Sequence, residues 1–160
     1  MLSIRNATIN DTAIILMFIR KLAEYEREPD AVVATEDDLR RDGFGPSPKF
    51  RCVIADWAGQ PAGFAFFFNN YSTWLGRPGI FLEDLFVLPE MRGKGIGKAL
   101  LRHLAQIAVR ENCYGLRWLV LKWNEPALKF YESLGAEALV EWETMRLAGL
   151  ALRRLAGEPE

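Results

Sequence analysis

The strongest constraint on the fold is a glycine-rich turn between an apolar run and a long amphipathic segment. Its sequence is VLPEMRGKGIG, over residues 87–97. Glycine lets the backbone turn tightly and approach a ligand closely. The unpaired N–H groups at the start of the following helix attract anions, and Arg92, Lys94 and Lys98 add positive charge. The turn therefore predicts a site for a phosphate or pyrophosphate group.

Spacing excludes two nucleotide-binding loops. A Walker loop requires GxxxxGK[ST], whereas the interval from Gly93 to Gly97 is one residue short and Ala99 cannot ligate magnesium. A dinucleotide-binding loop requires GxGxxG, and Lys98 or Leu100 occupies the place of its third glycine. The phosphate therefore belongs to another class of ligand.

Hydrophobic periodicity and turn residues predict a mixed α/β protein with a largely antiparallel sheet and one β-α-β unit near its end. Predicted strands cover residues 2–8, 50–56, 61–68, 80–88, 118–121 and part of 137–147. Predicted helices run from the Asn10-Asp11 cap to Glu28-Pro29, over 36–41 with a stop at Asp42-Gly43, over 93–110, and from Asn124-Glu125-Pro126 to a Gly135 cap. The predicted buried face of the long helix consists of Ile96, Leu100, Leu104, Ile107 and Ala108.

The composition indicates one globular domain over residues 1–160. The formal net charge of −1 argues against nucleic acids and anionic membranes as partners. No apolar run approaches the roughly 20 residues of a membrane span, and the N-terminus lacks a signal-peptide core, so we expect a cytoplasmic protein. Because His103 is the only histidine and Cys52 and Cys113 lack metal-ligand spacing, we expect no metal site.

The pattern R-x-x-G-x-G at Arg92, Gly95 and Gly97 resembles the coenzyme A pyrophosphate loop of the GNAT superfamily of N-acetyltransferases. Further segments, in order from about residue 4 to 147, resemble its spermidine/spermine (diamine) and thialysine acetyltransferase branch. These segments are Tyr25-Glu26, Thr35-Glu36-x-Asp38-Leu39, Asp42-Gly43-Phe44-Gly45, Leu82-Glu83-Asp84, and Trp123-Asn124-Glu125-Pro126 with Phe130-Tyr131. The resemblance implies the α/β GNAT fold, with six to seven strands and about four helices, acetyl-CoA as acetyl donor, and a homodimer.

The resemblance also implies which residues bind the cofactor. The backbone of Leu85, Phe86 and Val87 is expected to pair with the pantetheine arm as an added strand does. Asn124 matches a cofactor-contacting side chain, although capping of the helix at Pro126 explains it equally well. The remaining expected contacts are Arg92, Gly93, Lys94, Gly95, Ile96, Gly97, Lys98 and Tyr131.

Glu83 and Asp84 interrupt an apolar run, and adjacent strand residues point to opposite faces. At least one carboxylate is therefore expected to face a covered surface, where an unpaired charge costs several kcal/mol. A solvated strand end or a salt bridge to arginine is the structural alternative. An alkylammonium has no lone pair for attack, so acetyl transfer requires a group that removes its proton. The resemblance implies that Glu83 is this base or holds the water that acts for it, and that Asp84 is an anion that binds the amine.

Periodicity alone favours Tyr131 as a packed aromatic, since it shares a helical face with Ala127 and Leu134. The resemblance implies instead that its hydroxyl is the general acid for the departing CoA thiolate. Four further positions match residues that line the amine pocket of that branch, although Tyr25 also continues a core stripe and the two glutamates suit solvent. These positions are Tyr25, Glu26, Trp74 and Glu143.

Two departures from that branch bear on the acceptor. Ser72 stands where an acid is usual, and Met145 stands where a tryptophan is usual. Losing one anion and one aromatic wall weakens a site for a long polycation. We therefore expect acetyl transfer, in a ternary complex, to a primary amine of a small molecule: a diamine, a polyamine, or thialysine or a similar lysine-like amine. The alternatives are a protein or peptide lysine acetyltransferase and a non-catalytic sensor of acyl-CoA.

Overall fold

The computed structural model describes residues 1–158. They form two compact units: an N-terminal unit, Met1–Leu121, and a C-terminal unit that begins at Lys122. The assignment of residues 1–160 to one domain remains a prediction. Within the described residues, no helix has the length and apolar character needed to cross a membrane.

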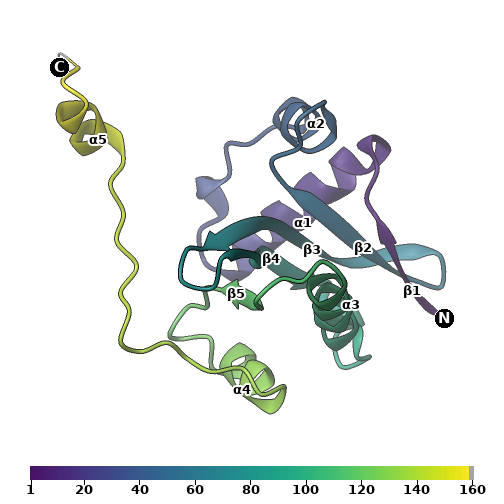
Figure 1. Ribbon diagram of the computed structural model, residues 1–160. Helices are drawn as coiled ribbons and strands as arrows, with labels where there is room; N and C mark the ends of the chain where they lie inside the picture. The colour runs from purple at the N-terminus through teal and green to yellow at the C-terminus, as the bar shows by residue number, and fades with distance from the viewer. Residues whose placement is uncertain (159–160) are drawn as a thin grey trace. The chain divides into compact units, whose positions relative to one another are not determined.

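The N-terminal unit is built on a mixed sheet with the strand order β1-β2-β3-β4-β5 (Figure 1). Neighbouring strands from β1 to β4 are antiparallel, whereas β5 is parallel to β4. The strands are β1 Leu2–Asn6, β2 Arg51–Trp57, β3 Gln60–Ser72, β4 Arg77–Val87 and β5 Leu116–Trp118. The predicted sheet type is thus confirmed, although the described residues supply five strands instead of six to seven.

Helices cover both faces of this sheet (Figure 1). They are α1 Thr12–Tyr25, α2 Glu36–Phe44 and α3 Ile96–Arg110, with short 3-10 turns η1 Ile9–Asp11, η2 Pro29–Ala31 and η3 Pro89–Met91. On the face of α1 and α2, Phe18 stacks on Phe64 with ring centroids 5.2 Å apart, and Phe86 completes the cluster. Successive side chains of a strand alternate between faces, so Phe67 points toward α3. All five residues predicted for the buried face of α3 are buried.

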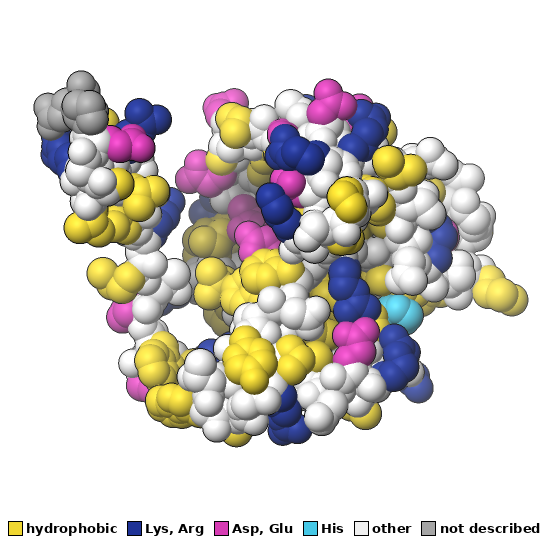
Figure 2. Space-filling model, turned by 45° about the horizontal axis from the view of Figure 1, so that its top comes forward, with side chains coloured by type: hydrophobic (Ala, Val, Ile, Leu, Met, Phe, Trp, Pro, Cys, Tyr) yellow, Lys and Arg dark blue, Asp and Glu magenta, His cyan; other side chains and the backbone are white. Residues whose placement is uncertain are grey.

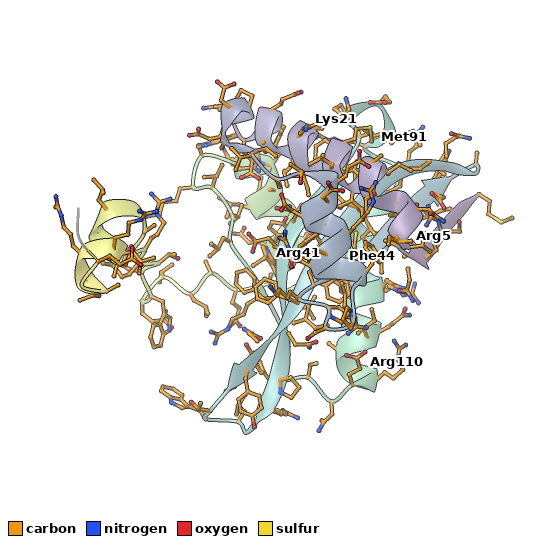
Figure 3. The ribbon with its side chains drawn as sticks, turned by 90° about the horizontal axis from the view of Figure 1, so that it is seen from above. Arg5, Lys21, Arg41, Phe44, Met91 and Arg110 are labelled. Atoms are coloured by element: carbon orange, nitrogen blue, oxygen red, sulfur yellow. The ribbon has the colours of Figure 1, made fainter. Side chains whose placement is uncertain are left out.

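The second helix is longer than predicted because Gly43 serves packing instead of ending the helix. α2 passes through Asp42-Gly43 and ends at Phe44, which Figure 3 labels beside Arg41. A Cβ atom at Gly43 would collide with the ring of Phe50. Phe44 in turn meets Phe50 edge-on, with ring centroids 6.3 Å apart. The glycine therefore permits close approach of α2 to the sheet.

The central hairpin is also longer than predicted. β3 continues to Ser72 instead of residue 68, and β4 begins at Arg77 instead of residue 80. The extension carries Asn69, whose amide donates a 3.1 Å hydrogen bond to the backbone oxygen of Gly79 across the pair. Polar residues in this part of β3 obscure the strand in a hydrophobic pattern, although the backbone pairing continues.

β5 occupies residues 116–118 instead of the predicted 118–121. Its last pair joins Trp118 to Leu82. The next residue of β4, Glu83, is an irregular position without a partner in β3. Parallel pairing therefore ends where β4 leaves its regular register.

The C-terminal unit contains α4 Glu125–Ser133 and α5 Gly149–Leu155. Gly135 has a φ of +88° and follows α4 as the predicted left-handed cap. The predicted strand within residues 137–147 is wrong for the described chain, which is irregular there. Its hydrophobic side chains are exposed, as Figure 2 shows for the C-terminal segment. A strand needs a hydrogen-bonding neighbour, and this segment pairs with none of the described residues.

Candidate active site

The glycine turn keeps its backbone open at the start of α3. Gly93 and Gly95 have φ values of +76° and +77°, and a Cβ atom at either position would meet no atom within 4 Å. Backbone conformation therefore requires glycine here, and it delays the predicted helix start from Gly93 to Ile96. Gly95 is the N-cap, and no side chain of the described residues caps the helix by a hydrogen bond. The first amides of α3 are thus available to an anion.

Three basic side chains surround this turn. The Lys94 ammonium lies 5.4 Å from the ring centre of Trp57, and the Lys98 side chain is exposed in the first turn of α3. The Arg92 Nε–H donates a 3.1 Å hydrogen bond to the Val87 backbone oxygen. Open amides, left-handed glycines and clustered cations fit a pyrophosphate, so the residues predicted to hold the CoA phosphates are suited to that group.

The end of β4 next to this turn has an open edge. On its β5 side, β4 is paired only at Ile80, Leu82 and the residue between them. On the other side its pairing with β3 continues to Val87. Within the described residues, the last part of β4 therefore lacks a strand on one side, and an extended ligand can add its hydrogen bonds there. Leu85, Phe86 and Val87, predicted to contact pantetheine, belong to this part.

A β-bulge at Glu83 sets the direction of the two acidic side chains. Asp84 pairs with Phe66 and Leu82 pairs with Phe67, which leaves Glu83 without a partner in β3. A bulge adds one residue to a strand and turns its side chains from regular alternation. Because Phe66 packs in the cluster beneath α1, Asp84 lies on the α1 face of the sheet. Its side chain is half-buried, whereas Glu83 is exposed, so the predicted covered carboxylate is confirmed as Asp84.

Three carboxylates share this corner. Burial, followed by the nearby charges of Glu83 and Glu26, raises the pKa of Asp84 to about 7. Burial, followed by the charge of Glu83, also raises the pKa of Glu26. Like charges in a partly covered site disfavour ionisation of each other. A cation placed here would relieve that repulsion, so the corner is suited to an ammonium group.

The last turn of α1 brings Tyr25 and Glu26 to the same corner. Glu26 is the C-terminal cap of α1, and its charge interacts with that of Asp84. The Tyr25 side chain is 36% exposed, and the Arg92 guanidinium carbon lies 4.8 Å from the centre of its ring. Tyr25, Glu26, Glu83 and Asp84 are therefore brought together, as predicted for an amine pocket.

Trp74 does not join them within one chain. It lies in the turn after Ser72 at the tip of the β3–β4 hairpin and is 89% exposed. The first pair of this hairpin is Ser72 with Arg77, and Asp84 follows about seven strand positions later. At roughly 3.3 Å per residue, Trp74 is about 20 Å or more from Asp84. The expected Trp74 contact with the same pocket is wrong for a single chain.

The remaining predicted residues belong to the C-terminal unit. The Asn124 side-chain oxygen accepts a 3.4 Å hydrogen bond from the Ala127 backbone N–H, so its predicted capping role is confirmed. Tyr131 lies beside Phe130 on α4, with ring centroids 5.5 Å apart. Glu143 is exposed. The roles of these three residues in binding or catalysis remain predictions.

The single histidine and the buried Cys52 are further reactive side chains. Within residues 1–158, no group of three His, Cys, Asp or Glu side chains is placed to hold a metal ion. His103 lies on α3 near basic side chains (Figure 2, cyan). Burial raises the pKa of the Cys52 thiol well above its usual value, which makes Cys52 an inert core residue.

Two features of the corner had no signal in the sequence. The bulge at Glu83 depends on register with β3, and the approach of Arg92 to Tyr25 joins residues far apart in the chain. The Lys94–Trp57 contact is of the same kind. A pattern within one segment cannot report such contacts. Only the interruption of an apolar run by two adjacent acids indicated that β4 is unusual.

Comparison with known proteins identifies the family of the chain and several similar proteins. Residues 16–136 match the Acetyltransferase (GNAT) family. Thialysine N-epsilon-acetyltransferase of Bos taurus is 42% identical over 166 residues, covering 97% of each chain. L-ornithine N5-acetyltransferase of Arabidopsis thaliana is 42% identical over 119 residues, covering 74% of this chain and 49% of the relative. A solved integron cassette protein from the mobile metagenome of V. cholerae superposes with a TM-score of 0.81 at 31% identity, covering 97% of each chain.

These comparisons identify the fold and the family of the chain. The family match covers α3 and nearly all of the sheet, and the similarity in structure extends over almost the whole chain. The α/β acetyltransferase fold predicted from the sequence is confirmed, with five strands in the described residues. The chain belongs to the acetyltransferase (GNAT) family and is an N-acetyltransferase.

Proposed function

We propose that the protein transfers acetyl from acetyl-CoA to the side-chain amine of a short, lysine-like molecule or a diamine. The carboxylate corner of Glu26, Glu83 and Asp84, beside the glycine turn, is the observation that carries this proposal. The relatives named for thialysine and ornithine support it, since both named acceptors are amino acids with a side-chain amine. Ser72 and Met145 weaken a site for longer polyamines.

The cofactor is proposed to bind along β4 and across the start of α3. Residues 92–98 would hold the pyrophosphate through backbone amides and cationic side chains. The open edge at Leu85–Val87 would pair with the pantetheine arm. Acetyl-CoA supplies an acetyl thioester, whose carbonyl carbon forms a bond to the amine nitrogen as its bond to sulfur breaks. Asn124 is proposed as a further cofactor contact.

The carboxylates are proposed to bind the ammonium and prepare it for attack. Asp84 attracts the cation, and the bound positive charge lowers the pKa of Asp84 from about 7. Glu83, which is exposed beside it, accepts the proton from the ammonium directly or through water. The neutral nitrogen then has the lone pair that the reaction requires. Tyr25 and Glu26 form the neighbouring wall.

Tyr131 is proposed as the general acid. Its hydroxyl would donate a proton to the sulfur of CoA as the carbon–sulfur bond breaks. The ammonium nitrogen loses two protons in all: the first goes to Glu83, and the second, released as the amide forms, replaces the proton that Tyr131 gave to the sulfur, directly or through water. Support for this role comes from the position of Tyr131 in the Asn124-Glu125-Pro126 and Phe130-Tyr131 pattern of the family branch.

A homodimer is proposed as the working assembly. The hydrophobic residues of 137–147 are exposed in the single chain, and Trp142 is 64% exposed. Trp74 is 89% exposed at a hairpin tip remote from its own Asp84. A second copy would cover the exposed segment and give Trp74 an acceptor pocket to line. Glu143, in the same exposed segment, is proposed to add negative charge to that pocket.

The test is CoA release from acetyl-CoA with lysine, thialysine, ornithine, putrescine, spermidine and spermine, and with a lysine peptide. We expect turnover with a lysine-like amine or the diamine, and weaker turnover with spermine. Turnover of the peptide alone would replace the proposal with protein lysine acetylation. Binding of acetyl-CoA without turnover of any acceptor would favour the sensor alternative. Asp84→Asn should abolish the preference of the enzyme for positively charged acceptors, whereas the matched variant Asp42→Asn, on α2, should retain this preference.

A further inference from the structure

We propose that Arg92 is a positioning residue for the amine acceptor, because it fixes the Tyr25 wall of the acceptor pocket to the cofactor-binding turn. This inference rests on the proposed function and concerns how the two substrate sites are joined. The glycine pattern alone predicts that Arg92 binds a phosphate group. Its observed contacts instead lie with β4 and α1.

The geometry holds Arg92 between three elements. The guanidinium carbon lies 4.8 Å from the centre of the Tyr25 ring and 5.6 Å from that of Phe86. The Nε–H bond to the Val87 oxygen is 3.1 Å long. The Arg92 backbone N–H also donates to the oxygen of Pro89 at 3.3 Å, in the η3 turn. Arg92 therefore links the end of α1, the end of β4 and the turn before α3.

The two rings that Arg92 contacts differ in burial. Phe86 belongs to the core cluster and is 4% exposed, whereas Tyr25 is the last residue of α1 and is 36% exposed. The end of a helix frays more readily than its centre. A cation placed over an aromatic ring attracts it, so Arg92 restrains the exposed Tyr25 ring. The carboxylate of Glu26, the next residue, is restrained with it.

Arginine suits this role better than lysine. Its planar guanidinium can lie against a ring while it donates a hydrogen bond in its own plane, and an ammonium cannot do both. A guanidinium carries five N–H donors, and the bond to Val87 uses one of them. Arg92 can therefore retain its bond to β4 while other donors face a phosphate. Lys94 is the contrasting cation of the same turn, because it lies against Trp57 on β2 instead of α1.

A consequence is that loss of Arg92 should appear mainly on the acceptor side. Arg92→Ala should raise the KM for the amine about tenfold, because Tyr25 and Glu26 lose their restraint. Arg92→Lys should give a smaller rise in the same constant, with acetyl-CoA affinity near that of the wild type. Lys94→Ala should show the opposite pattern, with weaker acetyl-CoA binding and an amine KM within about twofold of the wild type.

The experiment is a double-mutant cycle between Arg92 and Tyr25. The variants are Arg92→Ala, Tyr25→Leu and their combination, and Tyr25→Phe keeps the aromatic ring. For each we would measure kcat and amine KM by CoA release, and the Kd of acetyl-CoA and of the amine by calorimetry. The combined variant should have nearly the amine KM of Tyr25→Leu alone, because the two residues act through one contact. Tyr25→Phe should retain more of the amine affinity than Tyr25→Leu, because it keeps the ring that Arg92 contacts.

Two results would overturn the inference. One is an Arg92→Ala variant whose acetyl-CoA Kd rises while its amine KM and amine Kd are unchanged, as expected of a phosphate ligand alone. The other is additivity of the two substitutions in the amine KM. Failure of the proposed function would look different, because the wild type itself would turn over none of the acceptors. Thermal unfolding of each variant excludes a change of fold, and Arg92→Lys provides the conservative comparison.

Discussion

The N-terminal and C-terminal units differ most in how they bury hydrophobic side chains. The N-terminal unit contains every buried residue of the described chain, including Phe18 and Phe64, which are fully buried. The described part of the C-terminal unit contains no buried residue, although Trp142, Met145 and Leu147 are hydrophobic. Burial of apolar area is the main source of folding stability. The N-terminal unit therefore has a hydrophobic core that stabilises its fold, whereas the hydrophobic side chains of the C-terminal unit are left exposed to solvent.

The largest expected effect tests this contrast directly. Phe64→Ala should lower the free energy of unfolding by about 3–5 kcal/mol, because it leaves a cavity beside Phe18 in the core. Trp142→Ala, its matched control, should change that free energy by less than about 0.5 kcal/mol at protein concentrations low enough to favour the single chain. Urea unfolding at several protein concentrations measures both values.

A loss from Trp142→Ala that grows with protein concentration would sharpen the comparison. It would show that a second copy of the chain covers the C-terminal segment, since association stabilises a folded chain by mass action. A large loss independent of concentration would contradict the contrast between the units, because it would mean that Trp142 is packed within its own chain.

The second prediction concerns chemistry instead of stability. Tyr131→Phe should lower kcat about 100-fold if the hydroxyl is the general acid, with acetyl-CoA affinity and unfolding free energy nearly unchanged. Tyr71→Phe, at the exposed end of β3, is the control and should leave kcat unchanged. Steady-state kinetics with the best acceptor and calorimetry with acetyl-CoA provide the two readouts. Wild-type turnover in Tyr131→Phe would remove this residue from the mechanism.

The third prediction is that Asp84→Asn stabilises the protein while it weakens amine binding. The pKa of Asp84 in the folded chain is about 7, above its ordinary value of 3.8. Between these pH values the folded state binds more protons than the unfolded state, so its stability falls as pH rises. Replacement by the neutral amide should therefore raise the unfolding free energy at pH 8 by about 2 kcal/mol, and have little effect at pH 4.

Thermal and urea unfolding of Asp84→Asn across this pH range checks the sign. Asp38→Asn offers the opposite case, because hydrogen bonds from the Thr35 backbone and hydroxyl lower the pKa of that carboxyl. Its native contribution is present at neutral pH and is lost on acidification. If Asp84→Asn were destabilising at pH 8, the acidic corner would have a cationic partner that offsets its burial.

The smallest expected effect concerns the glycine turn. Gly95→Ala should weaken acetyl-CoA binding about fivefold, because alanine strains the φ of +77° that presents the α3 amides to the phosphate. Gly59→Ala is a matched control, since Gly59 has a φ of +80° and equally open surroundings in the β2–β3 turn. It should lose similar stability and bind acetyl-CoA as the wild type does. Equal affinities in both variants would contradict the phosphate role of the turn.

Local patterns in the sequence predicted the elements that depend on a short stretch of chain. The buried face of α3, the cap at Gly135 and the glycine turn are examples, since periodicity and backbone φ are properties of consecutive residues. The errors arose where a distant residue decides the outcome. Gly43 was interpreted as a helix end although Phe50 explains it, and polar residues such as Asn69 hid the extension of β3.

The sequence by itself determined the family, the α/β class, the glycine turn before the long helix and the presence of two adjacent acids in a strand. Only the tertiary structure decided which acid is covered, because the register of β4 with β3 places the bulge at Glu83 and turns Asp84 toward α1. It also separated Trp74 from that corner and brought Arg92 to Tyr25. Burial, charge coupling and ring contacts depend on distances in space, and residues far apart in the chain set those distances only when the sheet and its helices pack.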